Sequence, residues 1–362
     1  ITGHIGLIWT RDDMSTAAIP AAFPYSKPRL RSVVGGATVR VLARLERTAA
    51  AEVATEWRGT KRYVWLLAIL APACALLPSA VVGVTQWPVL WLSGPIVVFL
   101  LIPAVDLVAA SNRTNPPEEI YAQLSADRFY RWCTFAFLPV QYVSLVVACW
   151  LWVDGGLSFV DKLGLALAVG LCGGVAINAA HELAHRFESA ERILAKIALA
   201  QSCYGHFFVE HNRGHHVNVA TPHDPASARF GESVYHFWFR SVTGGFRSAL
   251  RIERERLARK KIRFLDPRNH LLQAWAVSLL VFGSLIGAFG VGILAWLVVQ
   301  ALVAVLLLET VNYLEHYGLL RERRANGRFR KVSPRDSWNS DRFVSNIFLF
   351  HLQFYQCQIG KK

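Results

Sequence analysis

Histidines gather in one stretch of the chain with a spacing that is typical of metal ligands. His181 and His185 are four residues apart, and His211 and His215 repeat this spacing, with His216 directly after them. On a helix, residues i and i+4 share one face, so each pair directs two imidazoles the same way. Neutral imidazole is the commonest metal ligand among side chains, and rings clustered without a metal repel one another when protonated. The pattern therefore predicts a metal site rather than a group of structural histidines.

The number of candidate ligands bears on the kind of metal site. Residues 181–185 read HELAH, which satisfies the HExxH pattern of zinc proteases and would make Glu182 a general base. A catalytic zinc needs only three protein ligands. This sequence offers six candidates, which suits most of a two-metal site: His181, His185, His211, His215, His216 and His316. The isolated histidines His206, His223, His236 and His270 are interpreted as structural or surface residues.

Three carboxylates stand beside these histidines in the sequence. Glu182, Asp224 and Glu315 are candidate acceptors for the ring N–H groups, and such acceptors fix the tautomer and orientation of a metal-binding imidazole. The alternative for each is a solvated or helix-terminal carboxylate, and the sequence favours neither.

The elements that must position these residues are apolar helices. The chain has 362 residues, 53% of them hydrophobic, and it contains two runs without any formal charge, 63–105 and 271–308. At ~1.5 Å per residue each run is long enough to cross a ~30 Å hydrocarbon layer twice. Turns are expected around 83–88 and 287–292. Single spans are expected over 132–153 and 163–180, with the second continuing into HELAH. The sequence thus predicts an all-α bundle of six transmembrane helices.

Charge predicts the orientation of this bundle. The formal net charge is +14, and nearly all of the Lys and Arg lie in the N-terminal segment, the 107–131 loop, the 184–269 segment and the C-terminal tail. By the positive-inside rule these segments are cytoplasmic, with both termini inside. The positive charge is interpreted as a sign that these segments bind an anionic membrane face or an acidic partner rather than nucleic acid. All three histidine groups then lie at the cytoplasmic ends of spans, where they can form one site.

The predicted site would favour iron. Many nitrogen donors and few carboxylates suit iron, copper or zinc better than magnesium or calcium. A site at the end of an apolar bundle suits a lipid-soluble substrate and chemistry on an unactivated C–H bond. That chemistry requires oxygen activation by a redox metal, which zinc is not.

Longer motifs carry a resemblance to a known family. The segments GHFFVEHNRGHH, VATPHDPASAR, NYLEHYGLL and SWNS with NIFLFHLQ resemble the membrane alkane 1-monooxygenases, also called alkane omega-hydroxylases. PAVDLVAASNRTNPPEE and GESVYHFWFR match the same family, so the resemblance covers nearly all of residues 60–353. HELAH alone would be weak, but EHNRGHH together with NYLEHYG is specific. Fatty-acid desaturases share the arrangement of three histidine boxes without these flanking segments.

The resemblance implies a function and a set of partners. It implies a bacterial inner-membrane enzyme that inserts one atom of O2 into the terminal carbon of a medium- or long-chain n-alkane. Two iron ions would be held mainly by the six histidines named above. Electrons would come from NADH through a reductase and a small acidic rubredoxin, a separate chain, which agrees with the absence of a CxxC motif here. The basic segments 251–263 and 321–331 are the predicted rubredoxin docking surface.

The ends of the sequence depart from that family. In the family, FHLQ (here 350–353) continues as RHSDHH, which supplies three more ligands, whereas Tyr355, Gln358 and Ile359 occupy those positions here. Residues 354–362 are interpreted as an aberrant tail from a frameshift or a fragment end, and the chain as written is expected to be inactive. Residues 1–61 are interpreted as a polar, basic N-terminal segment, within which Met14 is the expected translation start. A hydroxylase domain is expected over 62–353.

The second expected span offers candidate residues for a substrate channel. Val98, Phe99 and Leu100 precede Pro103 on the second expected span and are candidates for lining an alkane channel, the alternative being lipid-facing packing. The sequence leaves three other functions open. They are a related hydroxylase or desaturase acting on another apolar chain, an intramembrane zinc protease, and a non-catalytic membrane protein.

Overall fold

The computed structural model describes residues 63, 65–108, 127–186 and 188–338. All of them belong to one compact unit, Glu52–Lys362. The predictions made for residues 1–61 with their start at Met14, and for the tail 354–362 with Tyr355, Gln358 and Ile359, lie outside the described residues.

Six helical segments are long and apolar enough to span a membrane. The regular structure of the described residues is helical, apart from one isolated antiparallel bridge between Arg323 and Phe329. The first span combines α2 (Trp65–Leu70), η3 (Ala71–Leu76) and α3 (Leu77–Thr85), and the second combines η4 (Pro88–Leu92), α4 (Ser93–Ile96), η5 (Val97–Leu101) and α5 (Ile102–Val108). The others are α7 (Arg128–Asp154), α8 (Phe159–Ala184), α13 (His270–Phe289), and η7 (Val291–Ile293) with α14 (Leu294–His316). The predicted all-α bundle of six spans is confirmed.

The two charge-free runs both turn back on themselves, as predicted. In the first, the backbone of Gln86 is left-handed at φ 59° and Pro88 begins the next helix. In the second, Gly290 ends α13 at φ 82°, a conformation that glycine adopts without the steric cost of a Cβ. Because these residues stop each helix after one membrane thickness, each run forms a hairpin of two spans.

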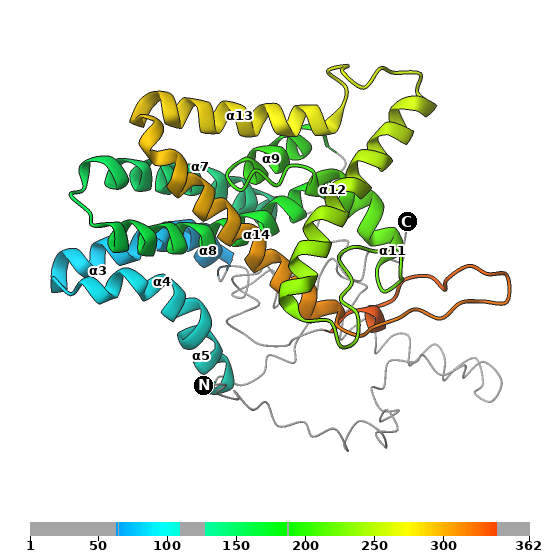
Figure 1. Ribbon diagram of the computed structural model, residues 1–362, viewed down its shortest axis with the longest axis horizontal. Coiled ribbons are helices and arrows are strands. Elements are labelled where there is room, and N and C mark those ends of the chain that lie inside the picture. The colour runs from blue at the N-terminus through cyan, green and yellow to red at the C-terminus, as the bar shows by residue number, and fades with distance from the viewer. Residues whose placement is uncertain (1–62, 64, 109–126, 187, 339–362) are drawn as a thin grey trace, which may run out of the picture. The chain divides into compact units, whose positions relative to one another are not determined.

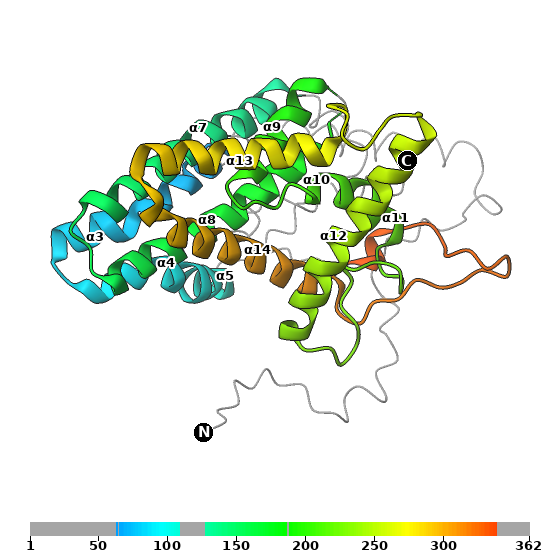
Figure 2. The same ribbon diagram turned by 45° about the horizontal axis from the view of Figure 1, so that its top comes forward.

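Helix α8 is the central element of the bundle (Figures 1 and 2). Of its most apolar stretch, 78% is buried, the highest share among the six spans. Glycines allow its neighbours to approach closely: a Cβ at Gly164 would lie 2.7 Å from the Trp91 carbonyl oxygen, and one at Gly170 would lie 2.7 Å from that of Gln300. Small residues at helix interfaces serve this purpose in membranes. Since α8 ends with His181 inside its last turn, this packing sets the position of the first histidine pair.

Substitution of Gly170 by alanine is expected to destabilise the protein. The new Cβ would lie 2.6 Å from the Val303 Cβ on α14, so the two helices must separate, and overpacking of this kind costs about 1–3 kcal/mol. Gly283→Ala on α13 is the matched control, because nothing lies within 4 Å of its Cβ position. Thermal unfolding in detergent should show a lower midpoint for Gly170→Ala alone. Equal midpoints would contradict the close packing of α8 on α14.

Further helices connect the fourth and fifth spans and carry the second histidine group. They are α9 (Ser189–Ala200), α10 (Phe207–Glu210), η6 (His211–His215), α11 (His216–Asn218) and the long α12 (Val234–Arg259). After α14 the chain returns past α11 toward η8 (Pro334–Asp336) (Figure 1). Arg321 holds this return, because its backbone N–H donates to the Ala220 carbonyl (2.7 Å) and its guanidinium Nη2 donates to the Val217 carbonyl (2.7 Å).

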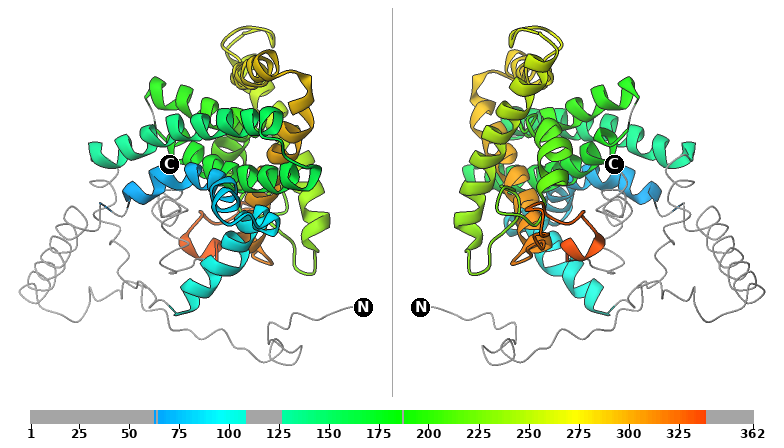
Figure 3. Two further views of the ribbon diagram at one scale, coloured as in Figure 1. Left: turned by 90° about the vertical axis from the view of Figure 1, so that its left-hand side faces the viewer. Right: turned by 90° about the vertical axis from the view of Figure 1, so that its right-hand side faces the viewer.

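The second span diverges from the bundle along its length. Helices η4 and α4 pack on α8, whereas α5 extends away from it (Figures 1 and 3). Only 6% of this span's most apolar stretch is buried within the described unit. Its surface is therefore available to lipid.

Candidate metal centre

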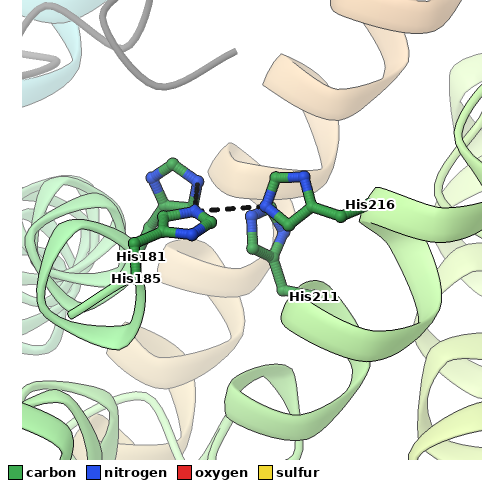
Figure 4. A group of neighbouring side chains, drawn as sticks. All are labelled: His181, His185, His211 and His216. Carbon is green, nitrogen blue, oxygen red and sulfur yellow. Dashed lines mark hydrogen bonds between the residues drawn. The ribbon is translucent and has the colours of Figure 1, made fainter. Parts of the chain in front are cut away.

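Four histidines from two separate segments of the chain meet at one point (Figure 4). His181 lies in the last turn of α8 and His185 directly follows that helix, while His211 begins η6 and His216 begins α11. One ring nitrogen from each lies within 4.8 Å of the corresponding nitrogens of the other three. The Nε2 atoms of His181 and His185 are 2.9 Å apart, and those of His185 and His216 are 3.1 Å apart.

A π-helical turn shapes the second histidine motif. Residues His211–His215 form η6, and π turns of this kind occur frequently at functional sites. Gly214 lies against the buried Glu210 side chain, and a Cβ there would lie 2.5 Å from Oε1 of Glu210. The His211 ring stacks on Phe207, four residues earlier, with ring centroids 4.6 Å apart. The turn thereby directs His211 and His216 toward the end of α8.

His215 turns to a second group instead. Its ring centroid lies 5.0 Å from that of His316, which ends α14. The Nδ1 of His215 contacts Oδ2 of Asp224 at 2.9 Å, and Nδ1 of His316 donates to the Asp336 carbonyl at 3.2 Å. Because Nδ1 of each ring is occupied in this way, Nε2 is the atom that each ring can offer to a metal. Such outer partners are typical of metal-binding histidines.

Asp224 is itself held in place by its neighbours. Its carboxylate accepts from the Ser227 hydroxyl at 2.5 Å and from the Ala226 backbone N–H at 3.2 Å. Burial opposes a charge on His215, but the adjacent Asp224 carboxylate outweighs it and raises the pKa of His215 to about 9. Burial also opposes ionisation of Asp224, yet His215 and Ser227 keep its pKa below the usual value. The pair is therefore an ionised carboxylate facing a protonated ring, and metal binding would replace the Nε2 proton while Nδ1–H stays on Asp224.

Both histidine groups border one cavity. His181, His211, His215, His216 and His316 line it, together with apolar residues and the return segment after α14; the other lining residues are Asn178, Phe207, Val219, Leu308, Val311, Asn312, Glu315, Val332, Ser333, Asp336 and Ser337. The structure thus brings the six predicted ligands into one region, four around one point and two beside it.

The donor set suits a metal. Burial, and then the neighbouring His216 and His181 rings, lower the pKa of His211, so this imidazole is neutral and able to bind a cation. Nε2 of His211 is buried and has no hydrogen-bond partner among the described residues. A buried polar atom without a partner is costly, and an ion at the convergence of the four rings would satisfy it. The residues present therefore fit a metal centre.

The predicted carboxylates and channel residues take different positions. Asp224 contacts a histidine ring, whereas Oε2 of Glu315 lies 3.9 Å from Nε2 of the adjacent His316, and Glu182 is buried in the last turn of α8. On η5, Phe99 and Leu100 are exposed, Val98 is half-buried, and none of the three lines the cavity described above. Their assignment to an alkane channel stays a prediction.

Some residues of the site were missed in the sequence. The Asp336 carbonyl that holds His316 is positioned by a capping box between Ser333 and Asp336 and by an ion pair between Asp336 and Arg330. The spacing of Ser333 and Asp336 is a known helix-start signal that could have indicated the turn. A buried polar group beside His211, formed by Glu210, Glu309 and Tyr204, was also missed, because nothing in the sequence marks these residues as buried.

Comparison with known proteins agrees with this geometry. The model of the fatty acid desaturase family matches residues 162–358, which include all six histidines. An alkane 1-monooxygenase of Acinetobacter baylyi is 40% identical over 299 residues, 81% of this chain and 72% of that protein. An alkane 1-monooxygenase of Pseudomonas putida is 39% identical over 301 residues, which cover 83% of this chain and 75% of that protein. The hydroxylase component of a xylene/toluene monooxygenase from Pseudomonas putida is 29% identical over 164 residues, which cover 44% of this chain and 43% of that protein.

The helical membrane fold and its histidine centre therefore define a member of the fatty acid desaturase family. The sequence identity to the two alkane 1-monooxygenases extends over most of this chain and most of each relative. The chain belongs to the alkane 1-monooxygenases.

Proposed function

We propose that this protein hydroxylates the terminal carbon of medium- to long-chain n-alkanes, using O2 and two iron ions. The observation that carries the proposal is the convergence of six histidines at the ends of apolar spans, five of which line one cavity while His185 joins the same ring cluster. One alkane, one O2, two electrons and two protons give one 1-alkanol and one water.

The residues of the chain have distinct roles in this proposal. His181, His185, His211 and His216 hold one iron, and His215 and His316 contribute to the second. Iron in this setting supplies the O2 activation that C–H hydroxylation requires. Asp224 and the Asp336 carbonyl keep His215 and His316 in the tautomer that presents Nε2. The surrounding apolar spans admit an alkane from the bilayer and exclude water.

The substrate path is proposed to follow the second span. That span diverges from α8, and Val98 on η5 is half-buried. Val98→Trp is expected to shorten the longest alkane accepted, because added bulk obstructs a close-packed channel. Leu279→Trp on α13 is the control, since Leu279 is 75% exposed and belongs to a different span. Product analysis over a series of n-alkanes measures the effect. An identical series for Val98→Trp and the parent would remove these residues from the path.

Electrons are proposed to come from reduced rubredoxin, docked on the basic end of α12. Arg251, Arg254 and Lys260 are exposed there, whereas Arg256 bonds to Glu253 and is unavailable for docking. Turnover should slow as salt rises, since the Debye length is only ~10 Å at about 0.1 M. Reversal of the three exposed residues to Glu should raise the KM for rubredoxin and flatten the salt dependence. Unchanged kinetics would place docking elsewhere.

The function is tested with membranes that contain the chain, supplied with rubredoxin, its NADH-dependent reductase and n-octane. The chain as written is proposed to be inactive, because Tyr355, Gln358 and Ile359 stand where the resembled family has histidines. A version in which RHSDHH and its following segment replace residues 354–362 should form 1-octanol. Two irons per chain would support the proposal, whereas one zinc and peptide hydrolysis would indicate a protease. Absence of alcohol from the repaired chain with both irons bound would refute alkane hydroxylation.

A further inference from the structure

A buried lysine lies on α9, away from the histidine centre. Lys196 is 5% exposed, and its Nζ contacts Nδ1 of His270 at 3.3 Å and bonds to Oε1 of Gln273. The amine also lies 5.0 Å from the centre of the Phe208 ring. No carboxylate among the described residues forms an ion pair with it. Buried charges are normally paired, because removal of an ion from water is costly.

Further cations surround Lys196. Arg192, on the same helix, places Nη2 3.0 Å from Nε2 of His270, and Arg213 and Arg256 also act on the lysine electrostatically. Burial first, and then Arg192, lower the pKa of Lys196 to about 8, so the amine is still largely charged at neutral pH. Four cations therefore share one small region at the junction of α9, η6, α12 and α13.

The acid in this region is already saturated. Glu253 on α12 is 0% exposed and accepts from Arg256 Nε (2.7 Å) and Nη2 (2.5 Å), from Arg213 (3.4 Å), and from the His270 backbone N–H (2.6 Å). It has no remaining capacity for Lys196 or Arg192. Among the described residues, one carboxylate thus faces four cations, and no carboxylate forms an ion pair with Lys196 or Arg192.

The His270 side chain cannot supply the missing negative charge. Nδ1 lies 3.3 Å from Oε1 of Gln273 and donates to it, so Nε2 is the acceptor for Arg192. The neutral ring can therefore accept a hydrogen bond from Arg192 but not from Lys196, whose acceptor is Oε1 of Gln273. An external anion beside Arg192 and Lys196 would offset their charge.

We propose that Arg192, Lys196 and Arg213 bind the phosphate of an anionic lipid headgroup. His270 is the first residue of the fifth span, so the cluster lies at the level where a span meets the membrane surface. Basic pockets between spans bind anionic headgroups in this manner. Arg192, Arg213, His270 and Gln273 are half-buried and so remain partly accessible, and Ile193 beside Arg192 is 56% exposed and could meet an acyl chain.

The test uses the purified full-length chain in a zwitterionic detergent. Phosphatidylglycerol should raise the thermal midpoint by at least ~3 °C, the size expected when a ligand binds only the folded state. Phosphatidylcholine, and inorganic phosphate at the same concentration, should not. Lys196→Met should be as stable as the parent without anionic lipid, because it removes an unpaired buried charge, and should lose the response. Arg259→Gln is the control: its side chain is 71% exposed and paired with Glu255 on α12.

Several outcomes would overturn the proposal. The proposal fails if phosphatidylglycerol does not raise the thermal midpoint of the parent, or if it raises the midpoint of Lys196→Met by the same amount. An equal shift with inorganic phosphate would assign the site to a soluble anion, and a shift with rubredoxin that Lys196→Met abolishes would assign it to a protein. If Lys196→Met does not fold, Arg192→Gln at the half-buried edge should lose the same response, and its retention would count against the site.

Discussion

Replacement of His181 by alanine in the chain with a repaired tail is expected to abolish 1-octanol formation and to lower bound iron. His181 is one of four rings whose nitrogens converge within 4.8 Å, so its loss leaves a gap in the first metal position. Loss of an outer partner alone typically costs about 10–100-fold in metal affinity, and loss of a ligand should exceed that. Gas chromatography of the product and metal analysis of the purified protein measure the two effects.

His236→Ala is the matched control for this experiment. His236 is exposed and contacts Glu232 at 2.9 Å, away from the cavity, so its removal should change neither iron nor alcohol. His215→Ala should resemble His181→Ala, because His215 borders the same cavity. Full activity with two irons in either ligand variant would show that the ring in question does not bind metal.

Asp224→Ala is expected to reduce iron content and activity by about 10–100-fold, the range typical of outer partners in metal sites. The substitution removes the acceptor 2.9 Å from Nδ1 of His215, so the ring can rotate and present the wrong tautomer. It also removes the charge that raises the pKa of His215 to about 9. Without that charge, burial favours the neutral ring, and the loss should come from disorder of the ring rather than from its protonation.

Asp224→Asn separates these contributions. The amide oxygen can still accept from Nδ1–H, so orientation is largely kept while the negative charge is lost, and an intermediate effect is expected. Asp266→Ala serves as the control, because Asp266 pairs with Arg268 on the connection before α13. Parent-level iron and activity in Asp224→Ala would mean that packing alone orients His215.

Much of the architecture could be read from the sequence because it depends on local chemistry. A run without charge over 63–105 must cross the membrane twice, whichever residues it later packs against, and Gly290 or Pro88 can stop a helix without help from other elements. The spacing of His181 and His185 likewise places both rings on one face of a helix end. Hydrophobic length and helical periodicity are properties of contiguous residues.

Tertiary structure decided which histidine meets which. His211 and His215 have the same spacing as His181 and His185, yet the π turn at η6 sends His211 to the α8 pair and His215 to Asp224 and His316. No spacing rule distinguishes the two fates, because they depend on where α8 and α14 end in space.

The partners of the outer groups were also decided by the tertiary structure. His316 is held by a backbone carbonyl at Asp336, which every residue type possesses and which therefore leaves no mark in a sequence. Lys196 and Arg192 are ordinary helix residues in sequence, and they form a cationic cluster only because α9 packs against the start of α13, more than seventy residues away. The sequence by itself determined which elements span the membrane and which residue types could bind metal. Their assignment to particular partners required the packing of elements distant along the chain, because the energies that decide it come from contacts between them.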